Sequence, residues 1–418
     1  MLKTLYPASF RRYSSLAILG PMVDGFTTWL LEQRYTCSYI RQRIWLLSYM
    51  ESVLIRRGVH HLSEVEQADL VACRKSLQRR FPYLTSSIDA LQKYMRTKDL
   101  LKPTEERTTS ATARYLDAYA HYLKTVRGAA ASTIQQNSYT ASEFLAYVKI
   151  EKHAGWLKTL TPNDLEVFVK TISHRFTRAS LQRIVGRVRC FLRFLAVKGE
   201  ISHGLDRQID TPRVYREEQL PSTLPWETVR AFLKSIDRSS LAGLRDFTMF
   251  SLMATYGLRA SDVVALTLDD IHWRAGKISI SQRKTGTALD LPLTDAIGMA
   301  LHRYLTKAPP PPPPFRQIFL RVKAPIGVLK TTAVSTAFRV WARRSGVDMP
   351  GRGSSHRIRH SYAVFLLRKG TSIKTIGDLL GHRTIESTST YLRLAIKDLR
   401  DVALSVPAES RGKKAVRP

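Results

Sequence analysis

The sequence is poor in cysteine and in acidic residues. Its three cysteines among 418 residues lie far apart without a CxxC pair, which excludes a disulfide framework and a cysteine-based zinc site and fits a reducing, cytoplasmic compartment. No run of 18 apolar residues is present, so no segment is expected to cross a membrane. Only 34 Asp and Glu residues face 66 Lys and Arg, which leaves a net charge of +32. Because such an excess repels itself unless a polyanion is bound, nucleic acid is the expected partner.

The length and the 44% hydrophobic content predict two or three domains, each with its own core. Two segments, 23–70 and 116–165, resemble each other in the order and spacing of their helical apolar residues. This likeness indicates either a duplicated helical domain or two unrelated helical bundles. The predicted boundaries are a helical domain at 1–105, a second at 106–202, a linker at 203–224, a mixed domain at 225–405 and a basic disordered tail at 406–418.

A helix predicted over 179–197 carries an apolar stripe beside five arginines. No acidic residue interrupts this basic stretch, so the helix is a candidate to face phosphates, although a solvated face has the same composition. The five candidate DNA-binding residues are Arg178, Arg183, Arg187, Arg189 and Arg193.

The mixed domain combines helical and alternating patterns. Helices are predicted over 226–236 and 241–256, and strands over 277–281 and 289–293 around a hairpin turn. A further short strand is expected at 318–320. The six-proline run at 309–314 indicates a stiff surface spacer. The expected fold class is therefore mainly α with a small β-sheet in this domain, an α+β arrangement.

Four short pieces of the mixed domain concentrate side chains that can act on a phosphate. A phosphodiester resists attack because its negative oxygens repel a nucleophile and its leaving alkoxide is unstable, so a site must supply positive charge and a proton donor. No single piece is decisive. The pieces are Gly257-Leu258-Arg259-Ala260-Ser261-Asp262, Arg283-Lys284-Thr285-Gly286, His356-Arg357-Ile358-Arg359-His360, and Leu380-Gly381-His382 followed by Tyr391.

The two histidines of the third piece imitate a zinc ligand pair. His356 and His360 are four residues apart and share a helix face. A metalloprotease would need a glutamate directly after the first histidine, and Arg357 stands there instead. Neighbouring arginines would also repel a dication. We therefore expect no metal site.

Taken in order, the four pieces resemble the tyrosine recombinase (phage integrase) family over roughly residues 225–402. The resemblance rests on Arg259, the hairpin Lys284, the H-x-x-R-H block, Leu-Gly-His, and a tyrosine nine residues beyond that histidine. It implies a helical, SAM-like core-binding domain near 112–200 followed by the mixed catalytic domain. The extra N-terminal segment, 1–105, departs from that two-domain plan, and its role stays open.

The resemblance also implies a role for each residue. Tyr391 would be the nucleophile that forms a 3′-phosphotyrosyl link to DNA, without metal, ATP or cofactor. The expected catalytic residues are Arg259 and Arg359 on the phosphate, His382 beside them, His356 as base for the phenol, Lys284 as proton donor to the leaving oxygen, and Tyr391. Asp262 and His360 are expected to support them.

The expected function is site-specific DNA recombination that serves integration, excision or transposition. A type IB topoisomerase uses similar groups, and an inactive DNA-binding accessory protein is the third alternative. The implied partners are double-stranded DNA and three further copies of the chain, a homotetramer on synapsed sites, with accessory recombinases or DNA-bending proteins as further candidates. The expected location is cytoplasmic and nucleoid-associated.

Overall fold

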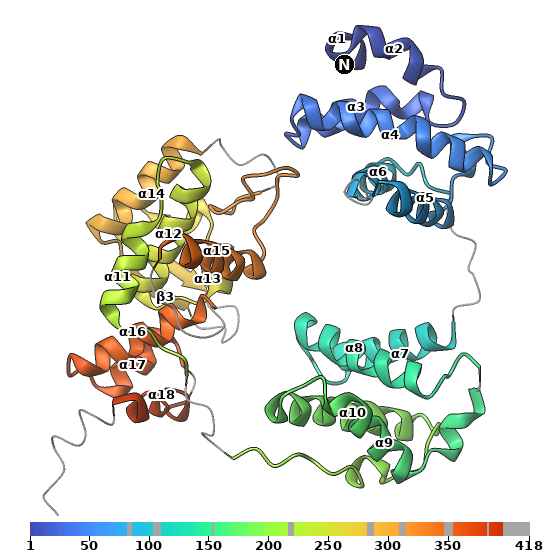
Figure 1. Ribbon diagram of the computed structural model, residues 1–418. Helices are drawn as coiled ribbons and strands as arrows, with labels where there is room; N and C mark the ends of the chain where they lie inside the picture. Colours follow the sequence, from blue (N-terminus) through green and yellow to red (C-terminus); the bar gives the residue numbers. More distant parts are fainter. Residues whose placement is uncertain are drawn as a thin grey trace, which may run out of the picture. The chain divides into compact units, whose positions relative to one another are not determined.

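A computed structural model describes residues 1–81, 86–102, 110–152, 154–215, 221–281, 288–308, 315–346, 354–382 and 384–395. The fold is mainly helical with one small antiparallel sheet, which confirms the expected fold class (Figure 1). The chain divides into two compact units: Met1–Ser52 together with Gln219–Pro418, and Val53–Glu218. The predicted boundary at residue 105 does not coincide with this division and stays a prediction.

The N-terminal part of the first unit is entirely helical in its described elements. A buried carboxylate organises it: Glu51 accepts hydrogen bonds from the amides of Ile18 and Leu19 at 2.7 and 3.0 Å. The carboxylate thereby satisfies donors that a helix start leaves unpaired. The elements are α1 (Leu2–Leu5), α2 (Pro7–Ser14), the 3₁₀ turn η1 (Gly20–Met22), α3 (Val23–Glu32) and α4 (Cys37–Ile55).

The second unit begins within α4 and continues as helices around an aromatic core. Tyr119 lies 4.9 Å from Phe191 between ring centroids, and Phe144 lies 5.2 Å from Phe168. The elements are η2 (Leu62–Glu64), α5 (Gln67–Arg80), α6 (Ser86–Thr97), α7 (Ala111–Thr125), α8 (Ala131–Tyr147), η4 (Ala154–Thr159), α9 (Pro162–Ser173), α10 (Arg178–Val197) and η5 (Leu205–Arg207).

The two similar sequence segments have the same order of elements. Two helices, a 3₁₀ turn and two further helices follow one another in α3, α4, η2, α5 and α6, and again in α7, α8, η4, α9 and α10. The order agrees with the predicted likeness between 23–70 and 116–165. A duplication as its origin stays a prediction.

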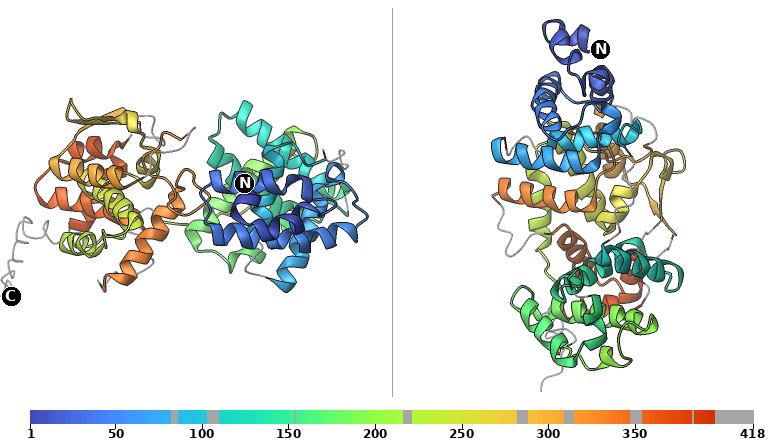
Figure 2. Two further views of the ribbon diagram at one scale, coloured as in Figure 1. Left: turned by 90° about the horizontal axis from the view of Figure 1, so that it is seen from above. Right: turned by 90° about the vertical axis from the view of Figure 1, so that its right-hand side faces the viewer.

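The C-terminal part of the first unit contains the sheet and the candidate site. The sheet order is β1-β2-β3, and Ile278 of β2 pairs with Leu291 of β3. The two longer strands, β2 and β3, lie at one edge of this part (yellow in the left view of Figure 2). The elements are α11 (Trp226–Ser235), α12 (Leu241–Tyr256), α13 (Ala260–Ala265), η6 (Leu268–Asp270), β1 (Ile271–His272), β2 (Lys277–Ser281), β3 (Ala288–Pro292), α14 (Asp295–Lys307), α15 (Thr331–Arg344), α16 (His356–Arg368), α17 (Ile373–Leu380), α18 (Glu386–Ser389) and η7 (Leu392–Ala395).

Periodicity located four of these elements, namely α11, α12, β2 and β3. The helix over 241–256 and the strand over 277–281 agree with the structure to the residue. The strand predicted at 318–320 was wrong: Gln317 and Leu320 form isolated bridges to two different partners, Thr267 and Val328, so no ladder develops. The proline run, the hairpin turn and the basic tail lie outside the described residues.

Candidate active site

Arg259 is positioned by a glycine that ends the preceding helix. Gly257 closes α12 in the left-handed conformation, with φ of +65°. A Cβ at this position would lie 2.6 Å from Leu380 Cδ2 and 2.7 Å from Tyr362 Cδ1, so both the backbone angle and the close approach require glycine. The chain then becomes extended, and Arg259 stands as the N-cap residue of α13.

Asp262 holds Arg259 from within the same short helix. Its carboxylate is fully buried, and Oδ2 lies 3.9 Å from Nη1 of Arg259, whose side chain is 12% exposed. The hydroxyl of Ser261 donates to the other carboxylate oxygen at 3.2 Å. A buried carboxylate beside a guanidinium restrains the position of the guanidinium. The supporting role of Asp262 stays a prediction.

Arg359 connects the segment that carries Arg259 with the Leu-Gly-His segment that carries His382. Its side chain, from α16, donates from Nη1 to the carbonyl of Gly257 at 2.7 Å and from Nη2 to the carbonyl of Leu380 at 2.6 Å. The two carbonyls precede Arg259 and His382 by two residues each. A guanidinium has five N–H donors, so three are left for a ligand. Burial, and then the charge of Arg259, lower the pKa of Arg359 to about 10, which still leaves it protonated at neutral pH.

His382 follows α17 through a second left-handed glycine, Gly381, with φ of +60°. Its Nδ1 lies 2.8 Å from Oγ1 of Thr388, a buried residue of α18. This bond leaves Nε2 of the ring for another partner. Thr388 was missed as a site residue, since its only signal was membership of a polar run before the tyrosine.

Tyr391 lies inside the site with its hydroxyl bonded to a histidine. The residue is 4% exposed, and its Oη lies 2.9 Å from Nδ1 of His360. The ring of His382 stacks on it with centroids 6.4 Å apart and planes 15° from parallel. Burial raises the pKa of Tyr391, whereas the charges of Arg359 and Arg259 act to lower it. The positive charge of the two arginines therefore opposes the effect of burial on this phenol.

The structure places His360, and not His356, at the phenol. His356 is the exposed first residue of α16, with its ring centroid 6.3 Å from that of His360. His360 was expected to support the site without touching the phenol, whereas the structure shows it in direct contact with the Tyr391 hydroxyl. Its supporting role stays a prediction. A role for His356 as base stays a prediction.

Both site histidines are neutral at neutral pH in the free protein. Burial lowers the pKa of His360 to about 4, and the charges of His356 and Arg359 add to that effect. Burial likewise lowers the pKa of His382 to about 4, helped by Arg359 and Arg259. A neutral imidazole retains a lone pair, so His360 is able to accept the proton of the Tyr391 hydroxyl.

These shifts predict stability that is lost in acid. Because folding lowers both pKa values from 6.5 to about 4, the unfolded chain binds more protons between those limits. The contribution of His360 and His382 to the free energy of unfolding is complete above about pH 6.5 and falls as the pH drops towards about 4. Denaturant titrations across this range should give a shallower pH dependence for the double variant His360→Asn, His382→Asn. An unchanged dependence would contradict the buried, neutral state.

Lys284 and the other residues of its turn lie outside the described residues, so its proton-donor role stays a prediction.

The five arginines of α10 have different surroundings. Arg189 donates to the carbonyl of Ile209 at 2.5 Å, and Arg193 lies 3.4 Å from the Asp206 carboxylate, so both hold the segment around η5. Arg187 donates to Gln136 of α8. Arg178 and Arg183 are exposed. Phosphate contact stays a prediction for these arginines, and the intramolecular contacts of Arg189 and Arg193 make them the weaker candidates.

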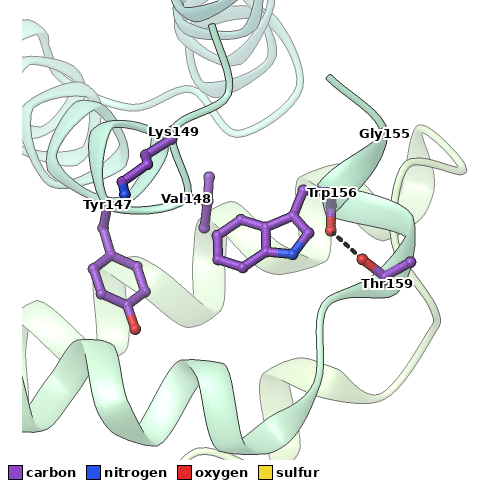
Figure 3. A pocket seen from close by; sticks show the side chains of 6 residues that line it. All are labelled: Tyr147, Val148, Lys149, Gly155, Trp156 and Thr159. Carbon is purple, nitrogen blue, oxygen red and sulfur yellow. Dashed lines mark hydrogen bonds between the residues drawn. The ribbon is translucent and has the colours of Figure 1, made fainter. Parts of the chain in front are cut away.

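A cavity of about 830 Å³ lies elsewhere, in the second unit (Figure 3). Trp156 and Tyr147 contribute aromatic walls, and the hydroxyl of Thr159 donates to the Trp156 carbonyl at 3.1 Å. The other lining residues are Val148, Lys149 and Gly155. Because it contains none of the catalytic candidates, this cavity is not part of the candidate active site.

Comparison with known proteins identifies the family. Residues 223–397 match the phage integrase family. The integrase/recombinase y4rA of Sinorhizobium fredii is 30% identical over 401 residues, which cover 94% of this chain and 96% of y4rA. The chain belongs to the phage integrase family of tyrosine recombinases. It is therefore an enzyme that breaks and rejoins DNA.

Other recombinases are similar over smaller parts of the chain. The tyrosine recombinase XerD of Listeria monocytogenes is 29% identical over 290 residues, which cover 69% of this recombinase and 96% of XerD. Among solved structures, a lambda integrase (75–356) dimer bound to a COC′ core site matches with a TM-score of 0.52 and 18% identity, covering 66% of this chain and 94% of that one. The post-cleavage complex of XerH with a palindromic difH substrate matches with a TM-score of 0.54 and 17% identity, covering 69% and 83%. At these identities the structural likeness shows the fold. No described helix of the recombinase is long and apolar enough to cross a membrane.

Proposed function

We propose that this recombinase cuts duplex DNA at a specific site by attack of the Tyr391 hydroxyl on a phosphodiester. The observation that carries the proposal is the contact of 2.9 Å between the hydroxyl of the buried Tyr391 and His360, in a site that also contains the buried guanidinium of Arg359. In the step, the bond between the phenolic oxygen and phosphorus forms, and the bond between phosphorus and the 5′ oxygen breaks. The phenolic proton passes to His360, and a proton from Lys284 goes to the departing oxygen.

The charges in the site suit the developing negative charge. Arg259 and Arg359 present planar forks to the non-bridging phosphate oxygens, and His382 donates from the nitrogen that Thr388 does not engage. Fixed donors of this kind stabilise a transition state without reorganising during the reaction. The product is a 3′-phosphotyrosyl link that conserves the energy of the cut bond. A free 5′-hydroxyl from another strand then reverses the step onto a new partner.

We propose a homotetramer on two synapsed DNA sites as the working assembly, in the service of integration, excision or transposition. A lambda integrase tetramer bound to a Holliday junction has the same fold, with a TM-score of 0.52 at 19% identity. The Tn1549 transposon integrase in complex with a circular intermediate DNA also matches, with a TM-score of 0.52 at 14% identity. Both support the proposal as analogies of fold. We further propose 106–202 as the core-binding domain and 225–405 as the catalytic domain.

A trapping experiment tests cleavage directly. Duplexes retained by the full-length protein from a random-sequence pool are converted into a series with a nick at successive positions. When the nick lies close to the cut, cleavage leaves a short fragment that dissociates. The covalent intermediate then accumulates, because no 5′-hydroxyl remains nearby to reverse the step. We expect a protein–DNA complex that survives denaturing detergent, with no metal or ATP added. A chain that binds these duplexes and never forms the complex would be an accessory protein, and relaxation of a plasmid that lacks the selected site would indicate a topoisomerase.

Two arginines of α10 offer a matched test of DNA contact. Replacing the exposed Arg183 by alanine should weaken DNA binding at all sequences and lower the slope of log affinity against log salt by about 1. Replacing Arg193 by alanine removes the ion pair with Asp206 and should leave that slope unchanged. Binding titrations over a range of salt concentrations measure both. Equal slopes for Arg183→Ala and the wild type would remove Arg183 from the DNA contacts.

A further inference from the structure

Helix α16 carries His356 and Arg359, and another of its faces contacts the chain that leads into α11. Arg357, Ser361 and Phe365 recur every four residues along α16 and therefore form one stripe. At about 100° per residue, Arg359 lies about 200° around the helix from Arg357. The stripe and the Arg359 side of α16 thus point in different directions.

The stripe holds the end of the predicted linker and the start of α11. The amide of Leu224 donates to the hydroxyl of Ser361 at 2.7 Å in a fully buried bond. Nη2 of Arg357 donates to the carbonyl of Thr223 at 3.3 Å. One turn further along α16 from Ser361, the ring of Phe365 stacks on Trp226 with centroids 4.5 Å apart and planes 19° from parallel. The incoming chain is therefore held at three consecutive turns of the catalytic helix.

Burial of the charged Arg357 side chain at its position lowers the stability of the fold. It is 3% exposed, and within the described part of the chain its Nε and Nη1 are buried without a hydrogen-bond partner. Burial lowers the pKa of the guanidinium, which reflects the cost of keeping a charge there. An apolar side chain of similar length would avoid this cost. Stability therefore does not explain an arginine at this position. Its contact with Thr223 points to another role.

We propose that Arg357, Ser361 and Phe365 form a linker clamp that positions α16 for catalysis. They are positioning residues, since they touch the incoming chain and not the reacting atoms. The proposal rests on the proposed function, because α16 supplies Arg359 and His360 to the DNA-cleaving site.

The clamp acts through the short hydrogen bonds that Arg359 and His360 of the same helix make. Arg359 reaches two carbonyls at 2.7 and 2.6 Å, and His360 reaches Tyr391 at 2.9 Å. A displacement of about 1 Å in a site of this kind costs on the order of 100-fold in rate. The contacts of Thr223, Leu224 and Trp226 with α16 therefore keep this helix in its active position, and their loss would let the helix shift.

The test separates cleavage from binding. Adduct formation is followed in single turnovers, with full-length protein in excess over the nicked duplex, together with the dissociation constant and the melting temperature. We expect Ser361→Ala and Arg357→Met each to slow adduct formation about tenfold while the dissociation constant stays within about twofold. Measurements are made well below every variant's melting temperature, so that loss of folded protein does not contribute.

A lysine at position 357 discriminates the clamp from a direct DNA contact. Because Arg357 makes one hydrogen bond, Arg357→Lys should restore the rate to within about threefold of wild type. If the unpartnered nitrogens instead hold a DNA phosphate, Arg357→Met will weaken binding and flatten its salt dependence, which overturns the clamp. A methionine variant that loses rate without recovery by lysine overturns it as well.

Matched controls come from α11. Ser235→Ala removes a hydroxyl that donates to the carbonyl of Phe232 in its own helix, and Arg230→Met removes an exposed arginine. Both should cleave at the wild-type rate. Wild-type protein that forms no adduct refutes the proposed function, whereas wild-type rates in Ser361→Ala and Arg357→Met refute the clamp alone.

Discussion

Replacing Tyr391 by phenylalanine is expected to lower covalent adduct formation by at least about 10⁴-fold, because no other group can take over the phenolic oxygen's attack. The substitution removes one buried hydroxyl and its bond to His360, which is worth about 1 kcal/mol of stability. The ring stays in its place against His382. DNA affinity should therefore stay within about twofold of the wild type, since phosphate contacts dominate it.

Tyr362 supplies the matched control for this variant. It lies on α16 and packs against Gly257 and Trp226, away from the Tyr391 hydroxyl's partner His360. Tyr362→Phe should form the adduct at close to the wild-type rate. A detergent-resistant complex from Tyr391→Phe at the wild-type level, or its loss from Tyr362→Phe alone, would contradict the assignment of the nucleophile.

Replacing Arg359 by lysine is also expected to lower the cleavage rate strongly. Lysine keeps the charge, but its single ammonium cannot span the carbonyls of Gly257 and Leu380 as the guanidinium does. The segments that carry Arg259 and His382 would lose their common attachment. We expect cleavage to fall about 10² to 10³-fold, with a loss of stability of about 2 to 4 kcal/mol because a buried carbonyl is left without a donor.

Single-turnover cleavage and denaturant unfolding measure the two parts of this prediction. Arg368→Lys, at the exposed end of the same helix, provides the control and should change neither quantity by more than a small factor. If Arg359→Lys cleaved normally and lost only stability, Arg359 would be a structural residue and would not belong to the phosphate site.

Residue pattern predicted the elements and the chemistry better than it predicted individual contacts. Gly257, Arg259 and Asp262 are neighbours in sequence, so local rules for helix ends were enough to group them. The contact between His360 and Tyr391 joins residues 31 positions apart. It depends on how α18 and η7 return the chain to α16, which no periodicity reports. The resemblance therefore assigned the phenol to His356, whereas the structure brings His360 to its hydroxyl.

The arginines of α10 show the same limit on charge patterns. A run of like charge indicates a basic helix, but it does not reveal that η5 folds back to provide Asp206 and the Ile209 carbonyl as partners. Arg357 is a further example, because its place inside the H-x-x-R-H block gives no sign of a contact with Thr223. In both cases the partner comes from the segment between the helical and catalytic parts, which has little regular pattern of its own.

Identification of the amino acid joined to DNA tests directly whether Tyr391 is the nucleophile. The trapped complex is digested with protease and nuclease, and the remaining nucleotide–peptide is sequenced by mass spectrometry. We expect a peptide modified at Tyr391 and joined to the 3′ phosphate of the cut strand. A link at any other residue, or to a 5′ phosphate, would contradict it.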